Sequence, residues 1–123
     1  MKHIPYEYKN CPSPGGGYVT GFLFDKKHPE VLFCRTDIGG TYRYEKETDS
    51  WKSLIDHVTM ERLDETFPIA IAVDEEKAGK LYIVCGVDHT DCGVLSVSED
   101  YGENFVYRPV PTSVHGNRNG RGT

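Results

Sequence analysis

The sequence predicts an all-β fold composed of β-propeller blades of the Asp-box (BNR-type) repeat. Three observations lead to this prediction. Short segments rich in β-branched and aromatic residues recur along the chain. Their order repeats after about 50 residues, a length typical of one four-stranded blade. One of the predicted hairpins also carries a turn motif that is typical of such blades.

Seven segments are predicted to be strands, because each is rich in Val, Ile, Phe or Tyr and is bounded by Gly, Pro, Asp or Lys. They span residues 18–25, 31–35, 41–45, 69–74, 81–86, 93–100 and 104–108. Residues 51–65 differ, because Leu54, Val58 and Leu63 follow the spacing of one helix face. We therefore expect one short helix between the two sets of strands.

The two sets of strands match each other residue by residue. Asp25 matches Asp74, and Phe33 matches Tyr82, both at a separation of 49 residues. Further along, Gly40 matches Gly93 and Trp51 matches Phe105 at slightly larger separations. The predicted repeat units span about 15–55 and 66–110, and 111–123 is expected to be a loop toward the next blade.

Residues 98–105 fit the Asp-box pattern Ser-x-Asp-x-Gly-x-x-aromatic. The side chains of Ser98 and Asp100 can bond backbone groups of a hairpin turn, Gly102 can adopt a positive φ, and Phe105 can fill the blade core. Asp100 is either a catalytic or calcium-binding acid or a stabiliser of the hairpin. The turn chemistry favours the stabiliser, because it explains every fixed position. The equivalent stretch 44–51 keeps only the closing aromatic residue.

The composition excludes several classes of partner. The net charge of -5 argues against nucleic acid, which requires a clustered positive surface. No apolar run approaches the roughly 18 residues of a membrane helix, so no membrane partner is expected. The first ten residues lack the apolar core of a secretion signal, which predicts a cytoplasmic protein unless a leader has been removed.

The cysteines predict no metal site. Cys34 and Cys85 lie in apolar runs, where cysteine is usually a small buried hydrophobe. Cys85, His89 and Cys92 could bind zinc, but their spacing matches no standard site. We expect no metal and no cofactor.

Asp37 lies between two predicted strands and precedes Gly39 and Gly40. It is either a turn residue or a catalytic carboxylate held at a strand end. The spacing alone favours the turn residue. The matching loop of the second unit is 87–92, and such loops open on the propeller face where binding sites gather.

Six stretches in order resemble the beginning of glycoside hydrolase family 74, which contains xyloglucanases and related endo-β-1,4-glucanases. They are YEYKN, GGGYVTG, RTDIGGTYRY, SLID, SEDYGENF and GNRNGRG. The resemblance implies two seven-bladed propellers that face each other across a cleft, with a β-glucan such as xyloglucan bound between them. It implies inverting hydrolysis with Asp37 as the general base, and a general acid from the second propeller, which lies outside this chain.

Other residues are candidates for substrate binding. Tyr18 follows three glycines and offers a ring either to a sugar or to the core. Arg35 either helps to keep the Asp37 carboxylate charged or is pointed elsewhere by strand alternation. Asn117, Asn119 and Arg121 belong to a polar, glycine-rich stretch that is either a sugar-binding loop or a flexible end.

Two blades do not close a ring, so we expect the remainder of the propeller to come from sequence beyond Thr123. The chain contains only one of the two carboxylates of an inverting mechanism, so we expect it to be inactive alone. The alternative is a non-catalytic Asp-box propeller segment that binds carbohydrate or protein.

Overall fold

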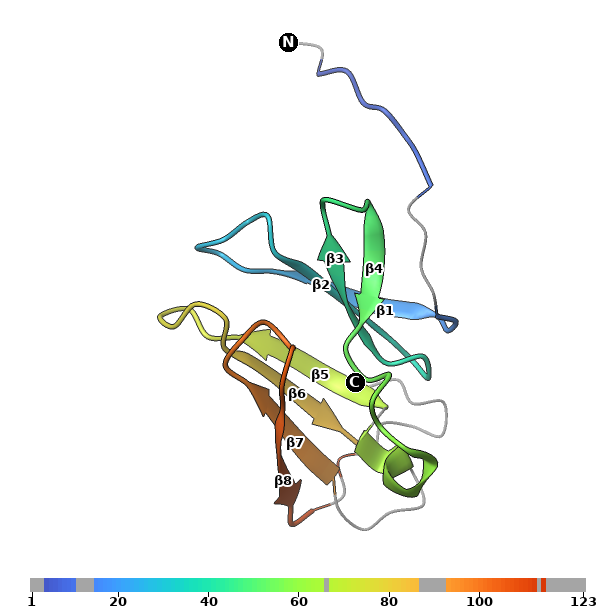
Figure 1. Cartoon of the computed structure of the whole chain (residues 1–123), viewed down its shortest axis with the longest axis vertical. Coiled ribbons are helices and arrows are strands. Elements are labelled where there is room, and N and C mark those ends of the chain that lie inside the picture. Colours follow the sequence, from blue (N-terminus) through green and yellow to red (C-terminus); the bar gives the residue numbers. More distant parts are fainter. Residues whose placement is uncertain (1–3, 11–14, 66, 87–92, 113, 115–123) are drawn as a thin grey trace.

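The computed structural model describes residues 4–10, 15–65, 67–86, 93–112 and 114. These residues form two four-stranded antiparallel sheets, each with its strands in chain order (Figure 1). The first sheet contains β1 (Val19–Phe24), β2 (Leu32–Thr36), β3 (Thr41–Glu45) and β4 (Ser50–Ser53). The second contains β5 (Pro68–Val73), β6 (Leu81–Cys85), β7 (Gly93–Ser98) and β8 (Val106–Val110). The all-β prediction is confirmed.

The one described helix is the 3-10 helix η1 (Met60–Glu65), in the segment that connects the two sheets. It is too short to cross a membrane, and no other helix of the described residues could do so. The short helix expected within 51–65 is present only as this 3-10 helix, and the first part of that stretch is not helical. Trp51 lies in β4 and pairs with Tyr44 of β3, and Leu54 is buried in the core between the sheets. Pairing and burial therefore outweigh the helical spacing there.

The register confirms the repeat and corrects one of its matches. Phe33 lies opposite Arg43 in the first sheet, and Tyr82 lies opposite Val97 in the second. The strands β3 and β4 therefore correspond to β7 and β8 at a separation of 54 residues. Trp51 then corresponds to Phe105 as expected, whereas the partner of Gly40 is Val94 and not Gly93.

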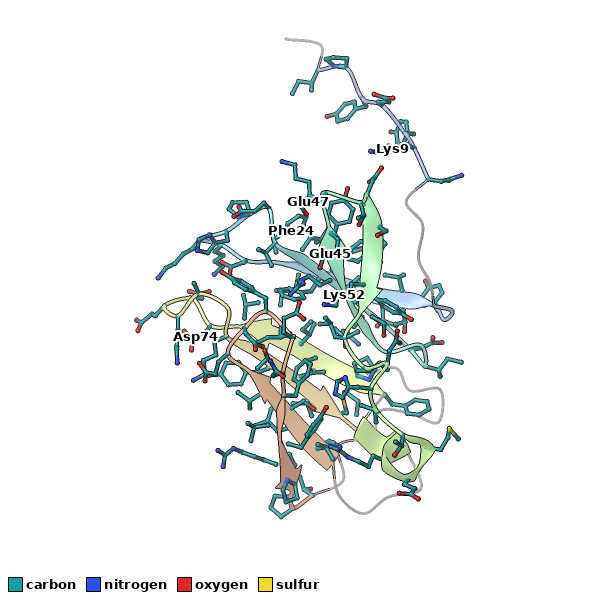
Figure 2. The ribbon with its side chains drawn as sticks, viewed as in Figure 1. Lys9, Phe24, Glu45, Glu47, Lys52 and Asp74 are labelled. Atoms are coloured by element: carbon teal, nitrogen blue, oxygen red, sulfur yellow. The ribbon has the colours of Figure 1, made fainter. Side chains whose placement is uncertain are left out.

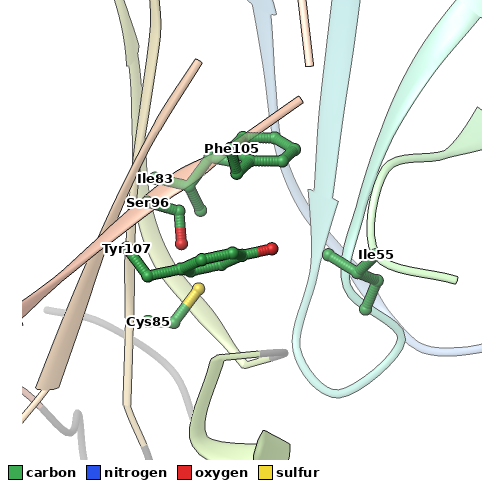
Figure 3. Close-up of a pocket in the computed structure, with 6 residues that line it drawn as sticks. All are labelled: Ile55, Ile83, Cys85, Ser96, Phe105 and Tyr107. Atoms are coloured by element: carbon green, nitrogen blue, oxygen red, sulfur yellow. The ribbon is translucent and has the colours of Figure 1, made fainter. Parts of the chain in front are cut away.

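The core lies between the two sheets. Phe33 is completely buried, and it packs in one cluster with Leu54 and with the side chains that alternate along β6. Neither sheet could bury these side chains alone, since each is a single layer. The core leaves a cavity of about 10 Å³, roughly the room that one water needs (Figure 3). Its lining residues are Ile55, Ile83, Cys85, Ser96, Phe105 and Tyr107.

The β1–β2 turn and the β5–β6 turn are each held by an aspartate at an equivalent position. Asp25 Oδ1 accepts hydrogen bonds from the backbone N–H groups of two following residues, Lys27 and His28. Asp74, 49 residues later, holds its own turn in the same way. Such side-chain bonds replace turn hydrogen bonds that the strands do not supply.

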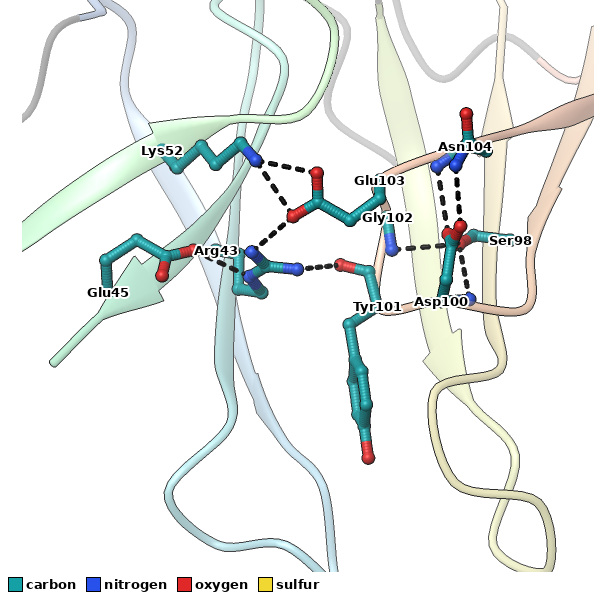
Figure 4. A network of polar contacts seen from close by, with 9 residues as sticks. All are labelled: Arg43, Glu45, Lys52, Ser98, Asp100, Tyr101, Gly102, Glu103 and Asn104. Atoms are coloured by element: carbon teal, nitrogen blue, oxygen red, sulfur yellow. Dashed lines mark hydrogen bonds and ion pairs between the residues drawn. The ribbon is translucent and has the colours of Figure 1, made fainter.

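A polar network joins the sheets beside the core (Figure 4). The Arg43 guanidinium donates to the carbonyl oxygen of Tyr101 at 2.9 Å and to Glu103 Oε1 at 2.7 Å. Lys52 Nζ donates to both carboxylate oxygens of Glu103 at 2.8 Å. Arg43 also pairs with Glu45 in its own strand. The network fixes the turn after β7 against the first sheet.

Removal of the Phe33 ring should destabilise the whole chain. We expect Phe33→Ala to lower the free energy of unfolding by about 3–5 kcal/mol, because it opens a cavity where both sheets meet. Phe24→Ala, at a position that is 56% exposed, should cost less than about 1 kcal/mol. Urea unfolding followed by circular dichroism measures both, and equal losses for the two variants would contradict a shared core.

Candidate functional site

Asp37 lies in the loop between β2 and β3, as predicted, and is partly buried. Its Oδ1 atom accepts hydrogen bonds from the backbone N–H groups of Tyr18 at 2.7 Å and of Ile38 at 2.8 Å. Its own backbone N–H donates to the carbonyl oxygen of Tyr18 at 2.9 Å. These bonds fasten the segment before β1 to the β2–β3 loop and fix the orientation of the carboxylate.

Glycines allow these two segments to approach each other. A Cβ atom at position 39 would overlap the carbonyl oxygen of Gly16, and one at position 15 would overlap the hydroxyl group of Tyr42. Gly17 has a φ of 109°, which side-chain-bearing residues rarely adopt. Gly15, Gly17 and Gly39 are therefore required by the contact itself.

Two buried side chains support the loop from below. The Tyr42 hydroxyl donates to the carbonyl oxygen of Gly39 at 2.6 Å. Thr36 donates through its backbone N–H at 2.9 Å and through its hydroxyl at 3.1 Å to the carbonyl oxygen of Gly40. Sequence reasoning missed both residues. The signal was present, because alternation places Thr36 and Tyr42 on one face of adjacent strands.

The outer side of the site is open. Tyr18 and Ile38 lie beside Asp37 where the segment before β1 meets the β2–β3 loop, and they are 65% and 62% exposed. Within the described part of the chain, Asp37 Oδ2 has no hydrogen-bond or ion-pair partner. One carboxylate oxygen is thus held by backbone donors while the other remains available to a water or a hydroxyl group.

Arg35 does not fulfil its expected role beside Asp37. It lies on β2 opposite Gly21, and its guanidinium covers the position where a side chain of Gly21 would stand. Among the described residues it forms no hydrogen bond or ion pair with Asp37. Its Nη1 atom and the hydroxyl of Thr41, its neighbour on β3, are buried without a partner.

The other predicted site residues lie outside the described residues. They are Asn117, Asn119 and Arg121, together with His89, Cys92 and the loop 87–92. Cys34 and Cys85 are buried, as expected of small hydrophobes, and burial raises the pKa of the Cys34 thiol to about 11. The described residues contain no group of three or more metal-binding side chains.

Asp100 lies in the turn between β7 and β8 (Figure 4). This turn corresponds to the β3–β4 turn of the first sheet, at the end of the strands opposite to the β2–β3 loop that carries Asp37. The side chain and the backbone N–H of Asn104 donate to its two carboxylate oxygens at 2.7 and 2.9 Å, and the Ser98 hydroxyl donates to Oδ1 at 2.8 Å. Ser98 in turn accepts from the N–H of Gly102. The side-chain oxygens of Ser98 and Asp100 thus all bond within the turn, which is the arrangement expected of a hairpin stabiliser.

A groove of about 320 Å³ also lies at the Asp100 end of the strands. Its lining comes from the turn after β1, the turn after β3 and the Asp-box turn. The residues are Glu30, Val31, Arg43, Tyr44, Glu45, Lys46, Glu47 and Tyr101. Since Asp37 lies at the other end, this groove does not extend its site.

Comparison with known proteins gives a consistent result. No protein-family model matches the chain. Curated relatives include the xyloglucanase Xgh74A of Acetivibrio thermocellus, 32% identical over 96% of this chain, and an oligoxyloglucan-reducing end-specific xyloglucanase of Emericella nidulans, 32% identical over 94%. A solved GH74 xyloglucanase from Xanthomonas campestris superposes with a TM-score of 0.78 at 29% identity, over 93% of this chain.

The chain corresponds to a segment of the family 74 glycoside hydrolases. A second GH74 structure, from Niastella koreensis, superposes with a TM-score of 0.72 at 29% identity over 82% of the chain. The chain spans only 15% of the Acetivibrio enzyme and 16% of the Xanthomonas chain. The likeness to family 74 therefore concerns this segment, and it includes the loop that carries Asp37.

Two substitutions of Asp37 should separate its hydrogen bonds from its charge. Asp37→Asn can keep an oxygen toward Tyr18 and Ile38, so the free energy of unfolding should change by no more than about 0.5 kcal/mol. Asp37→Ala removes the acceptor of two backbone donors and should cost about 1–2 kcal/mol. Urea unfolding of both variants tests this, and an unaltered Ala variant would show that the bonds contribute nothing.

The stability contribution of Asp100 should depend on pH. The hydrogen bonds, with that from the Asn104 side chain first, lower the pKa of Asp100 from 3.8 to about 2. The folded state therefore favours the ionised form, and this stabilisation is present above pH 4 and is lost as the pH falls toward 2. Its size should not exceed about 1 kcal/mol, because solvent screens the carboxylate.

Asp100→Asn tests this expectation, since its new amide group would oppose the amide of Asn104. The melting temperature should lie below that of the unchanged chain at pH 6, and the difference should shrink between pH 4 and 2. Other carboxylates are present in both proteins and cancel in the comparison. A difference that stays constant down to pH 2 would argue against the ionised turn.

Proposed function

We propose that this chain forms part of the cleft wall of an inverting glycoside hydrolase that cleaves β-1,4-glucosidic bonds of xyloglucan or a related glucan. Asp37 is the general base in this proposal. Support comes from the relatives named as xyloglucanases, which align with nearly the whole chain. Asp37 falls within the aligned segment, directly after the last residue of β2.

One observation carries the proposal. The Asp37 carboxylate is oriented by two backbone donors through Oδ1, and its Oδ2 atom is left without a partner in the described residues. A general base needs this arrangement, because the proton acceptor must be held within hydrogen-bond reach of a water and remain unoccupied before substrate binds. Loops fixed by backbone contacts hold such a group more precisely than mobile loops.

The chemistry requires a second carboxyl group. In an inverting mechanism the base activates a water on one face of the sugar, and an acid roughly 6.5–9.5 Å away protonates the leaving oxygen. We infer that the acid comes from a part of the enzyme outside these residues. Tyr18, largely exposed beside Asp37, offers a ring for stacking on a sugar face.

A non-catalytic role is the second candidate, and one observation favours it. The two bonds to Oδ1 give Asp37 a structural task even without substrate. In a binding module, Asp37→Asn would leave both the fold and the affinity for glucan unchanged. In a hydrolase, the same change removes the proton acceptor and leaves binding intact.

Activity measurements on a chimera test the proposal. Residues 1–123 would replace the matching segment of the Acetivibrio xyloglucanase, and release of reducing ends from xyloglucan would be followed. We expect Asp37→Asn to lower kcat by about 100-fold or more, since it removes a general base. Asp100→Asn should lower the melting temperature but keep the kcat of the folded fraction.

The isolated 123-residue chain is the control, and it should release no reducing ends because it lacks the acid. Full turnover by the Asp37→Asn chimera would exclude Asp37 as the base. Loss of turnover in the Asp100→Asn chimera, without unfolding, would mean that the two aspartates have been assigned the wrong way round.

A further inference from the structure

The side chain of Tyr42 reaches from β3 to the loop that carries Asp37. Tyr42 is 3% exposed, and its hydroxyl donates to the carbonyl oxygen of Gly39 at 2.6 Å. The same hydroxyl lies against Gly15, where an added Cβ atom would overlap its oxygen. The end of this one side chain therefore contacts the backbone of both segments that meet at Asp37.

The two segments are also in direct contact with each other. A Cβ atom at position 39 would overlap the carbonyl oxygen of Gly16, and one at position 17 would lie 3.0 Å from Asp37 Oδ1. The next residue, Tyr18, donates its backbone N–H to Asp37 Oδ1 at 2.7 Å and accepts from the Asp37 N–H at 2.9 Å. Because the packing is this close, a shift of either segment moves the donor that orients the carboxylate.

The Tyr42 hydroxyl remains a hydrogen-bond donor at neutral pH. Burial, and after it the negative charge of Asp56, raises the pKa of Tyr42 above its ordinary value. The phenol therefore keeps its proton, and the carbonyl oxygen of Gly39 accepts it as a hydrogen bond. The direction of this bond is thus fixed by the chemistry of both partners.

The second sheet shows that a blade does not need a long side chain at this position. Tyr42 pairs with Cys34 in the first sheet. Its equivalent in the second sheet is Ser96, which pairs with Ile83 (Figure 3). Ser96 is 3% exposed, and its hydroxyl has no hydrogen-bond partner among the described residues. A serine suffices for the sheet itself, so the reach of Tyr42 is specific to the sheet that carries Asp37.

We propose that Tyr42 is a positioning residue for Asp37. Its hydroxyl sets the place of Gly39 and of the segment before β1, and this contact keeps the N–H of Tyr18 on the carboxylate. Tyr42 is buried and acts through the backbone, so it does not contact substrate. The catalytic part of this inference rests on the proposed role of Asp37 as general base, whereas the positioning itself does not.

Loss of one oxygen atom should therefore affect the reaction. Tyr42→Phe keeps the ring and its burial but leaves the carbonyl oxygen of Gly39 without this donor. The β2–β3 loop and the segment before β1 are then free to shift against each other. A misplacement of about 1 Å at a catalytic group can cost 100-fold in rate, so a small shift is enough to be measured.

Amide hydrogen exchange on the 123-residue chain, followed by NMR, tests the positioning. Tyr42→Phe should accelerate exchange of the Tyr18 and Asp37 amides by about 10-fold or more, because the bonds of both amides cross between the two segments. Unchanged exchange of these two amides would overturn the proposal. Should Tyr42→Phe not fold, Gly15→Ala replaces it, because its methyl group would push the same hydroxyl from its place.

Tyr44→Phe is the matched control, because it removes the same group from the same strand. The Tyr44 hydroxyl donates to Asp49 Oδ1 at 2.6 Å, near the end of β3 that Glu45 marks in Figure 2. This variant should leave the amides of Tyr18 and Asp37 unchanged. Equal acceleration by both variants would indicate a general loosening of the strand and would also overturn the proposal.

Turnover of the chimera tests the consequence for the reaction. Tyr42→Phe should lower kcat about 10-fold and leave KM within about twofold, whereas Tyr44→Phe should change neither. In an Asp37→Asn chimera, Tyr42→Phe should lower kcat no further, since the carboxylate through which Tyr42 acts is gone. A second 10-fold loss in that background would mean that Tyr42 acts on the fold and not through Asp37.

The two experiments separate this inference from the proposed function. If Asp37→Asn keeps full turnover, Asp37 is not the base, and the exchange measurement alone decides whether Tyr42 positions its carboxylate. If Asp37→Asn loses turnover while Tyr42→Phe keeps it, the positioning role is wrong and the proposed base stands. Circular dichroism and thermal melting of every variant establish that it is folded.

Discussion

Everything in this structure depends on the burial of Phe33, Leu54 and the inner side of β6 between two sheets. A single four-stranded layer has no interior, so each sheet is stable only where another layer covers it. The polar network around Arg43 then fixes how the layers lie relative to each other. Apolar burial holds the layers together, and directional bonds hold their relative orientation.

The candidate site depends on this stacking only indirectly. Asp37 directly follows β2, whose first half is anchored in the core by Phe33. Its carboxylate is then positioned by a local contact between two glycine-containing segments, with Tyr42 and Thr36 below. A rigid strand supplies the place, and backbone hydrogen bonds supply the orientation, which is how loops carry precise chemistry.

The strands, the repeat and the Asp-box turn could be predicted because they follow from local chemistry. Alternation, turn residues and recurring spacing are properties of short segments. The helix expected within 51–65 formed only over Met60–Glu65, because Trp51 and Leu54 are placed by pairing and by burial, which a periodicity count does not contain. The position of Asp37 was predictable, but its bonds to the segment before β1 were not. Those bonds arise from contacts between separate segments.

The topology has a consequence for how the chain folds. Each strand pairs only with its neighbours in sequence, so each sheet can form through a series of short hairpin closures. Such local closures carry a small entropic cost, and they favour rapid folding compared with sheets that join distant strands. The contacts of Phe33 and Leu54 with β6, and the bonds of Arg43 and Lys52 to Glu103, form only when the two layers meet. We therefore expect the docking of the layers, and not the closure of the hairpins, to be the slow and cooperative step.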